Sequence, residues 1–240
     1  MDYRLALMTG TDIPIPECQL VLHQPTAKEI GLIGEEDFFL GLQTLWIDKN
    51  RYVEDETLLS NETNFHIFMT IMREKEYADR KKAATQLLSI VFPNYKINFL
   101  PSGTILFNKN GENIIIDENN FDFLQDTLRQ VFCYKTSTKD DFNPANEEAR
   151  KIAQKLLRGR QRVAQQKRGD SEGSMFSIYL STLSVGLQIP LTVLSNYTMY
   201  QIYDIYERYT LYTNWDVDLR ARLAGANPDS SPENWMKNIH

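Results

Sequence analysis

A run of 31 residues without a charged side chain, residues 173–203, limits what this chain can fold into more than any other feature of its sequence. A membrane span needs about 20 mostly apolar residues. The preceding block, residues 150–168, has eight Lys or Arg and no acid, as cytoplasmic flanks of membrane spans do. However, 11 of the 31 residues are Ser, Thr, Asn or Gln, and Pro190 interrupts them. The run therefore favours a buried helical hairpin over a membrane span.

The spacing of residues predicts the two helices of this hairpin. The first covers residues 174–186, a turn follows at 189–190, and the second covers about 195–212. The second helix has a tyrosine at every third residue from Tyr197 to Tyr212. Because three residues turn a helix by about 300°, the tyrosines wind around it and do not form one stacking platform. Such a helix is expected either to be surrounded by protein or to bind a partner.

A short last helix over residues 215–223 and a terminal tail complete the predicted C-terminal part. The tail carries Trp235 in a motif typical of a peptide that docks on its own domain or on a partner. Acids and bases spaced by four residues predict ion pairs on the last helix rather than a cation site: Asp216 with Arg220, and Asp218 with Arg222.

The first third of the chain is predicted to be extended at its start and then helical. Residues 1–22 mix apolar residues with prolines and turn signals, which indicates extended segments. Thr26 and Glu29 have the spacing of a capping box, in which each side chain binds an unpaired amide of the first helical turn. We therefore predict one helix over residues 27–46.

Helical and strand patterns then alternate. Apolar residues recur at helical spacing over residues 65–72 and 84–91, which predicts two amphipathic helices. Three apolar runs separated by turn residues predict a small antiparallel meander over residues 96–117. A further helix is expected over residues 121–132.

These elements define a mainly α-helical α+β fold. The predicted order is a helical N-terminal domain with a small antiparallel β insert, a connector and a C-terminal helical hairpin. The predicted boundaries are 1–135 for the helical domain, 136–172 for a polar linker and basic connector helix, 173–225 for the hairpin and 226–240 for the tail.

The sequence lacks the motifs of common catalytic and cofactor sites. It has no glycine-rich phosphate loop, dinucleotide fingerprint, nucleophile elbow or paired-cysteine zinc spacing, and its three histidines are far apart. We therefore expect no enzyme activity, no cofactor and no metal. A net charge of −6 argues against non-specific nucleic-acid binding by the whole molecule. Two cysteines and a start without a secretory signal pattern fit a reducing compartment.

Both ends of the chain resemble a known family. Residues 24–30 (QPTAKEI), with Gly34-Glu35 and Phe38-Phe39, are followed much later by residues 194–204 (LSNYTMYQIYD), Arg208 and a terminal Trp-Met-Lys-Asn-Ile. This order resembles the tail and baseplate assembly chaperones of tailed bacteriophages. The resemblance implies transient binding of a tape-measure or hub protein in the host cytoplasm, without catalytic residues. Related chains in the same gene neighbourhood are permanent virion components, so a structural tail or baseplate protein is the alternative.

The expected working surface lies in the C-terminal half and not on the β insert. Aromatic anchors and nearby cations could together hold an acidic amphipathic helix of a client. The alternative is that the tyrosines only bury their helix, and a third reading, a nucleic-acid-binding module, rests on residues 150–168 alone. The candidate partner-binding residues are Arg158, Arg160, Arg162, Tyr200, Tyr203, Tyr206, Tyr209 and Trp235.

Overall fold

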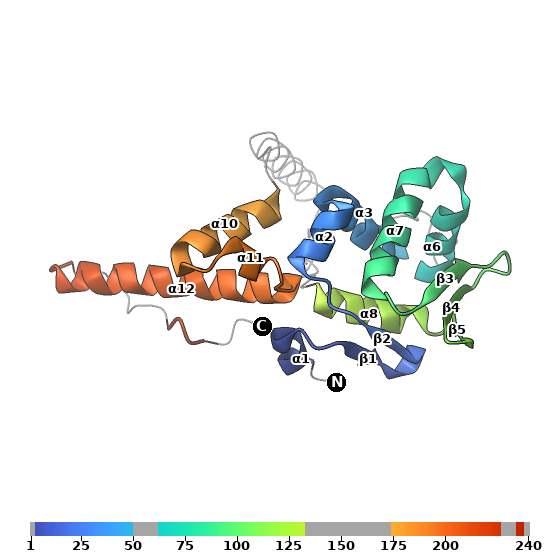
Figure 1. The fold of residues 1–240 in the computed structure, drawn as a ribbon, viewed down its shortest axis with the longest axis horizontal. Coiled ribbons are helices and arrows are strands. Elements are labelled where there is room, and N and C mark those ends of the chain that lie inside the picture. The colour runs from blue at the N-terminus through green and yellow to red at the C-terminus, as the bar shows by residue number, and fades with distance from the viewer. Residues whose placement is uncertain (1–2, 50–61, 133–173, 227–233, 238–240) are drawn as a thin grey trace, which may run out of the picture.

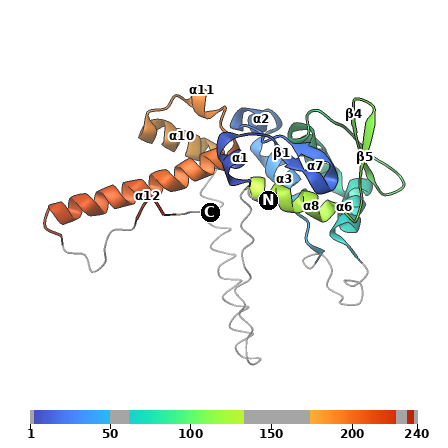
Figure 2. The ribbon, with the colours of Figure 1, turned by 90° about the horizontal axis from the view of Figure 1, so that it is seen from below.

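The computed structural model describes residues 3–49, 62–132, 174–226 and 234–237 (Figures 1 and 2). It is a mainly helical α+β fold with a small antiparallel sheet, as the sequence predicts. Its elements are α1 (Arg4–Thr9), β1 (Ile13–Ile15), a 3₁₀ turn (Pro16–Cys18), β2 (Leu20–Leu22), α2 (Ala27–Ile33), α3 (Glu35–Leu45), α6 (Asn64–Arg73), a second 3₁₀ turn (Lys75–Tyr77), α7 (Ala78–Val91), β3 (Lys96–Phe99), β4 (Ile105–Lys109), β5 (Glu112–Ile116), α8 (Phe121–Val131), α10 (Met175–Leu187), α11 (Leu191–Leu194) and α12 (Met199–Leu223).

The first part of the chain packs around one aromatic core. Helices α6, α7 and α8 lie beside the β3–β4–β5 sheet, α2 and α3 pack against α7, and the β1–β2 hairpin runs along α8 (Figure 1). Fully buried phenylalanines link these elements. Phe68 of α6 stacks on Phe121 of α8 with ring centroids 5.1 Å apart, and Phe92 meets Phe107 of β4 at 5.2 Å. This core positions the C-terminal helices against α1, α2 and α3.

The predicted meander is confirmed. β3 pairs with β4 and β4 with β5, all antiparallel. Asn110 and Gly111 connect β4 to β5 with φ values of 53° and 91°. Two consecutive positive φ angles are what the tightest right-twisted hairpin turns require, and Asn-Gly tolerates them.

The predicted helix over residues 27–46 is two helices. The capping box is present, because Thr26 N donates to Glu29 Oε2 at 2.8 Å and Glu29 N donates to Thr26 Oγ1 at 3.3 Å. However, α2 ends at Ile33 and α3 begins at Glu35. Gly34 between them has φ 87°, a left-handed value that the helix cannot continue through. The prediction therefore missed a break that this glycine produces.

Two other predictions were wrong in part. Extended structure is present in β1 and β2, but residues 4–9 form the helix α1, which ends at Gly10 with φ 68°. The predicted separate helices 195–212 and 215–223 are one helix, α12. Thr213 Oγ1 donates to Tyr209 O at 2.8 Å within that helix, so the polar residues there do not interrupt it.

The start of α12 is joined to the N-terminal segment by backbone hydrogen bonds. Thr26 and Thr198 form an isolated antiparallel bridge. Ala27 N donates to Tyr197 O, and Lys28 N donates to Ser195 O, both at 2.9 Å. The N-termini of α2 and α12, each closed by its own capping box, therefore lie side by side.

The Glu29 carboxylate in this junction predicts a pH dependence of stability. Burial raises its pKa, but hydrogen bonds from the backbone and side chain of Thr26 and from His23 outweigh burial, so its pKa lies below its usual value. The stability that the charged form contributes is present above the ordinary glutamate pKa, about 4.3, and is lost as the pH falls through the lowered value. Glu29→Gln keeps the capping geometry and removes the charge. We expect the advantage of the native chain over Glu29→Gln in urea unfolding to shrink from pH 7 to pH 3, and a pH-independent difference would contradict this account.

Candidate functional site

The C-terminal helices pack on each other through aromatic rings. Tyr179 of α10 lies 4.3 Å from Tyr206 and 5.3 Å from Tyr203 between ring centroids, and Phe176 lies 6.2 Å from Tyr203. Farther along, Gly186 of α10 lies so close to Tyr209 that a Cβ atom there would overlap the ring and its hydroxyl. α10 therefore packs against three of the α12 tyrosines, Tyr203, Tyr206 and Tyr209.

The predicted aromatic site residues are thus packed within the chain. Tyr200 is only 4% exposed and belongs to the core, and Tyr203, Tyr206 and Tyr209 are half-buried against that core. These contacts favour the core alternative over a free aromatic surface. The three predicted arginines, Arg158, Arg160 and Arg162, lie outside the described residues, as do the linker and the connector.

Trp235 lies on α12. Its ring meets Tyr212 edge-on at 5.4 Å and lies 6.5 Å from Trp215. Arg208 Nη1 donates to the backbone oxygens of Trp235 at 2.7 Å and of Lys237 at 2.8 Å. Of the two alternatives that the sequence left open for this segment, docking on its own domain is the one that the structure contains.

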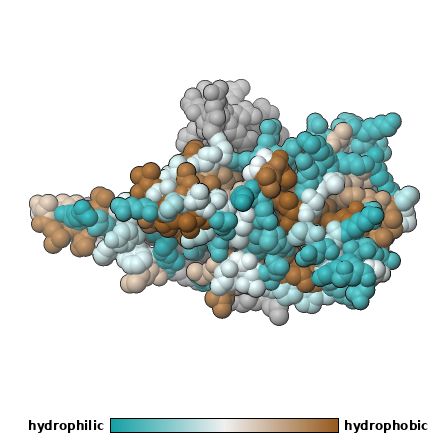
Figure 3. All heavy atoms as spheres, in the orientation of Figure 1, coloured by the Kyte–Doolittle hydropathy of each residue, from teal (hydrophilic) through white to brown (hydrophobic). Residues whose placement is uncertain are grey.

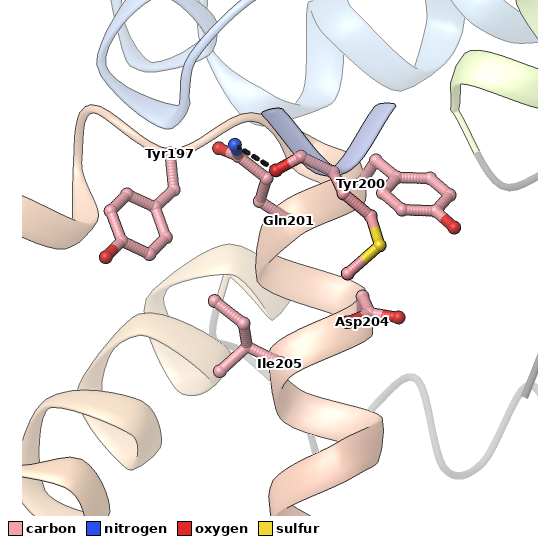
Figure 4. Close-up of a pocket in the computed structure, with 6 residues that line it drawn as sticks. Tyr197, Tyr200, Gln201, Asp204 and Ile205 are labelled. Carbon is pink, nitrogen blue, oxygen red and sulfur yellow. Dashed lines mark hydrogen bonds between the residues drawn. The ribbon is translucent and has the colours of Figure 1, made fainter. Parts of the chain in front are cut away.

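A shallow pocket lies where α1 meets the start of α12. Its volume is about 280 Å³, near the lower end for small-molecule sites. Figure 4 shows Tyr197 and Tyr200 on either side of Gln201, with Asp204 and Ile205 one turn farther along the helix. Gln201 Nε2 donates to the backbone oxygen of Met8 at 2.9 Å and so closes one wall. The pocket presents one carboxylate and no nucleophile–base pair.

The described residues also offer no group of three or more His, Cys, Asp or Glu side chains that could hold a metal ion. None of the helices in the described ranges is both long and apolar enough to cross a membrane.

The surface that sequence reasoning missed is on the outside of α10 and α11. Figure 3 shows apolar side chains gathered over these two helices. The exposed aliphatic residues of these two helices are Ile178, Val185, Leu187, Leu191 and Val193, and we call them together the α10–α11 apolar face. Ile178 and Val185, seven residues apart, lie on one side of α10, and Leu187 lies on the other side of that helix. Val185 is 81% exposed. The sequence feature that points to this surface is the charge-free run of residues 173–203. Such a run indicates that its apolar side chains are buried, but it does not say whether the chain itself or a partner buries them.

The same residues match a known family model. Residues 171–240 are similar to the YomV second domain. That family is phage-derived. The match contains α10, α11, α12 and the docked segment around Trp235, and therefore the whole α10–α11 apolar face. Neither a curated protein nor a solved structure matches the chain. The YomV match is consistent with a phage origin.

Cys18, the cysteine within the described residues, is buried and its thiol is poorly reactive. It is 1% exposed, and burial, with a smaller contribution from the charge of Glu17, raises the pKa of its thiol to about 11. Because the thiolate is the reactive form, we expect Cys18 in a Cys133→Ser variant to react with iodoacetamide at pH 8 roughly a hundredfold more slowly than in the guanidinium-unfolded chain. Equal rates would show that the site opens readily.

Proposed function

We propose that this protein is a bacteriophage tail or baseplate assembly chaperone that binds a tape-measure or baseplate hub protein during morphogenesis in the host cytoplasm. The observation that carries the proposal is the α10–α11 apolar face, which is exposed and lies in a segment without charged residues. Exposed apolar side chains that gather on one part of a surface typically mark interaction sites, and Figure 3 shows such a gathering over α10 and α11. The YomV match on these residues is consistent with a phage origin, and the choice of client rests on the resemblance of both ends of the chain to phage assembly chaperones.

The size of the face suits transient binding. Fully burying a Val, Leu or Ile side chain contributes about 1.5–3 kcal/mol, and the five residues of the face are already partly buried. Association costs about 4–15 kcal/mol in lost freedom of motion. The two quantities are of similar size, so a client helix would be held reversibly and released on incorporation into the tail.

Val185→Arg is the variant that tests this surface. The side chain is 81% exposed, so we expect its replacement to change the unfolding free energy by less than about 0.5 kcal/mol. A charge at this position of the apolar face would be desolvated by a bound client. We expect the soluble yield of a tape-measure or hub protein of the same phage, co-expressed with this chain, to fall at least about tenfold.

The matched control is Ile115→Arg. Ile115 is also exposed, at 52%, and lies in β5 of the insert, far from α10 (Figure 1). It should leave client solubility unchanged. If Val185→Arg and Ile115→Arg behave alike, or if none of the co-expressed tail proteins is kept soluble by the native chain, the chaperone proposal fails at this surface.

A structural virion protein is the competing function. A chaperone leaves before the particle is complete, whereas a tail or baseplate component stays at fixed stoichiometry. Mass spectrometry of purified particles separates the two, because stoichiometric recovery of this chain would contradict transient binding.

A further inference from the structure

The C-terminal half of α12 extends past the helix that covers its first half. α10 reaches α12 as far as the contact between Gly186 and Tyr209, and α12 continues to Leu223. Both ribbon views show this end projecting from the molecule (Figures 1 and 2). Trp235 contacts Tyr212 and Trp215, and Tyr212 remains 45% exposed. A helix in water depends mainly on packing of an apolar face for its stability. Within the described residues, the two turns after Trp215 project without such packing, so binding of a partner there would stabilise them.

One face of this end is apolar and only partly covered. Tyr212, Trp215, Leu219 and Leu223 follow one another at steps of three, four and four residues, which places them on one stripe. Leu219 is half-buried, but Leu223 is 81% exposed. The stripe therefore continues beyond the docked segment as an open strip centred near Leu219.

The two edges of the strip carry the same charge order. On one edge Asp216 Oδ2 lies 2.8 Å from Arg220 Nε, and on the other Asp218 Oδ2 lies 3.1 Å from Arg222 Nε. Each edge thus has an acid followed, one turn later, by a base. Such an edge is complementary to itself when it is reversed in direction, because the acid of one copy then meets the base of the other.

We propose that this end of α12 pairs with the same end of a second copy of the chain, antiparallel, about a two-fold axis near Leu219. In that arrangement each edge meets the same edge of the other copy. Asp216 then faces Arg220 of the second copy, Asp218 faces its Arg222, and Leu223 packs near its Trp215. A helix of uniform charge would be repelled by half of each edge, so charge complementarity selects a second copy over an acidic or a basic partner.

The contact is small, which sets the expected affinity. Three helical turns bury less than the roughly 800 Å² per partner of a typical stable complex. The pair should therefore be reversible and form at concentrations in the micromolar range or above. It lies on a different surface from the α10–α11 apolar face and does not depend on the chaperone proposal.

Charge redesign of the full chain tests the pairing by sedimentation velocity at low salt. The native chain should change from the 27.9 kDa monomer toward a dimer as its concentration rises. One variant, Asp216→Arg with Asp218→Arg, makes the end wholly basic, and another, Arg220→Asp with Arg222→Asp, makes it wholly acidic. Each alone should dimerise at least about tenfold more weakly, and an equimolar mixture should recover the dimer. Circular dichroism checks that both variants remain folded.

Single engineered cysteines in a Cys133→Ser background test the direction. Two copies of Leu219→Cys meet at the axis and should cross-link on oxidation. Two copies of Leu223→Cys would be separated by about 12 Å along antiparallel helices, beyond the reach of a disulfide, and should not cross-link. A native chain that stays monomeric at high concentration, a dimer that survives in each charge variant alone, a mixture that does not dimerise, or efficient cross-linking through Leu223→Cys would each overturn the proposal.

Discussion

Replacing Phe38 with alanine should lower the free energy of unfolding by about 3–5 kcal/mol. The side chain is fully buried, and its ring lies 5.6 Å from that of Phe132 at the end of α8 and 6.4 Å from that of Phe176 in α10. Its removal leaves a cavity where α3, α8 and the C-terminal helices meet, and rigid neighbours cannot fill such a cavity. Urea unfolding followed by circular dichroism measures the loss.

The same variant should loosen α10 selectively. Because Phe176 loses one ring partner, backbone amides of α10 should exchange hydrogen faster in Phe38→Ala than in the native chain, while those of β4 should keep a larger share of their protection. Phe123→Ala is the matched control, since Phe123 is 50% exposed and its loss should cost far less. A loss below about 1 kcal/mol in Phe38→Ala would mean that α3 and α10 are not packed together as described.

Gly41→Ala should destabilise the protein by about 1–3 kcal/mol, although alanine is the better helix former by about 1 kcal/mol. A Cβ atom at Gly41 would lie 2.7 Å from the backbone oxygen of Ala83 and 3.0 Å from Leu87 Cβ. The obstacle is backbone, so α3 and α7 would have to separate. Thermal unfolding should show a lower melting temperature.

Gly31→Ala is the matched control for this substitution. Gly31 is also helical, but nothing lies within 4 Å of its Cβ position. Alanine there should stabilise the protein by about 0.4–1 kcal/mol. Opposite signs for the two glycines are the expected result, and a stabilising Gly41→Ala would show that α3 and α7 are farther apart than the structure places them.

Local sequence signals predicted the elements whose geometry is decided locally. The meander follows from apolar runs and from Asn110-Gly111, and the start of α2 follows from Thr26 and Glu29, because each depends on residues only a few positions apart. Gly10 and Gly34 were misread for a related reason. A glycine is compatible with a turn, a helix end or a helix interior, and local sequence does not say which of these conformations it takes.

The candidate site was less predictable, since it depends on contacts between distant residues. Tyrosine spacing alone left core and partner surface open, and the close fit of Gly186 against Tyr209 favours the core. The exposure of Val185 could not be predicted from the sequence either. An uncharged segment has the same composition whether its apolar side chains are covered by its own chain or by another protein.

The hydrogen bonds between residues 26–28 and 195–198 have a consequence for synthesis. Ala27 leaves the ribosome 170 residues before its acceptor, Tyr197. At about 5–20 residues per second, that separation is a wait of roughly 10 to 30 s. During this interval the amides of Ala27 and Lys28 have water as their partner, and the α1 backbone lacks Gln201, which binds Met8 O in the finished protein. The N-terminal helices are thus synthesised first, but they gain their last hydrogen bonds only when α12 is made. A chain that is released before α12 is synthesised would lack these bonds at its N-terminal end.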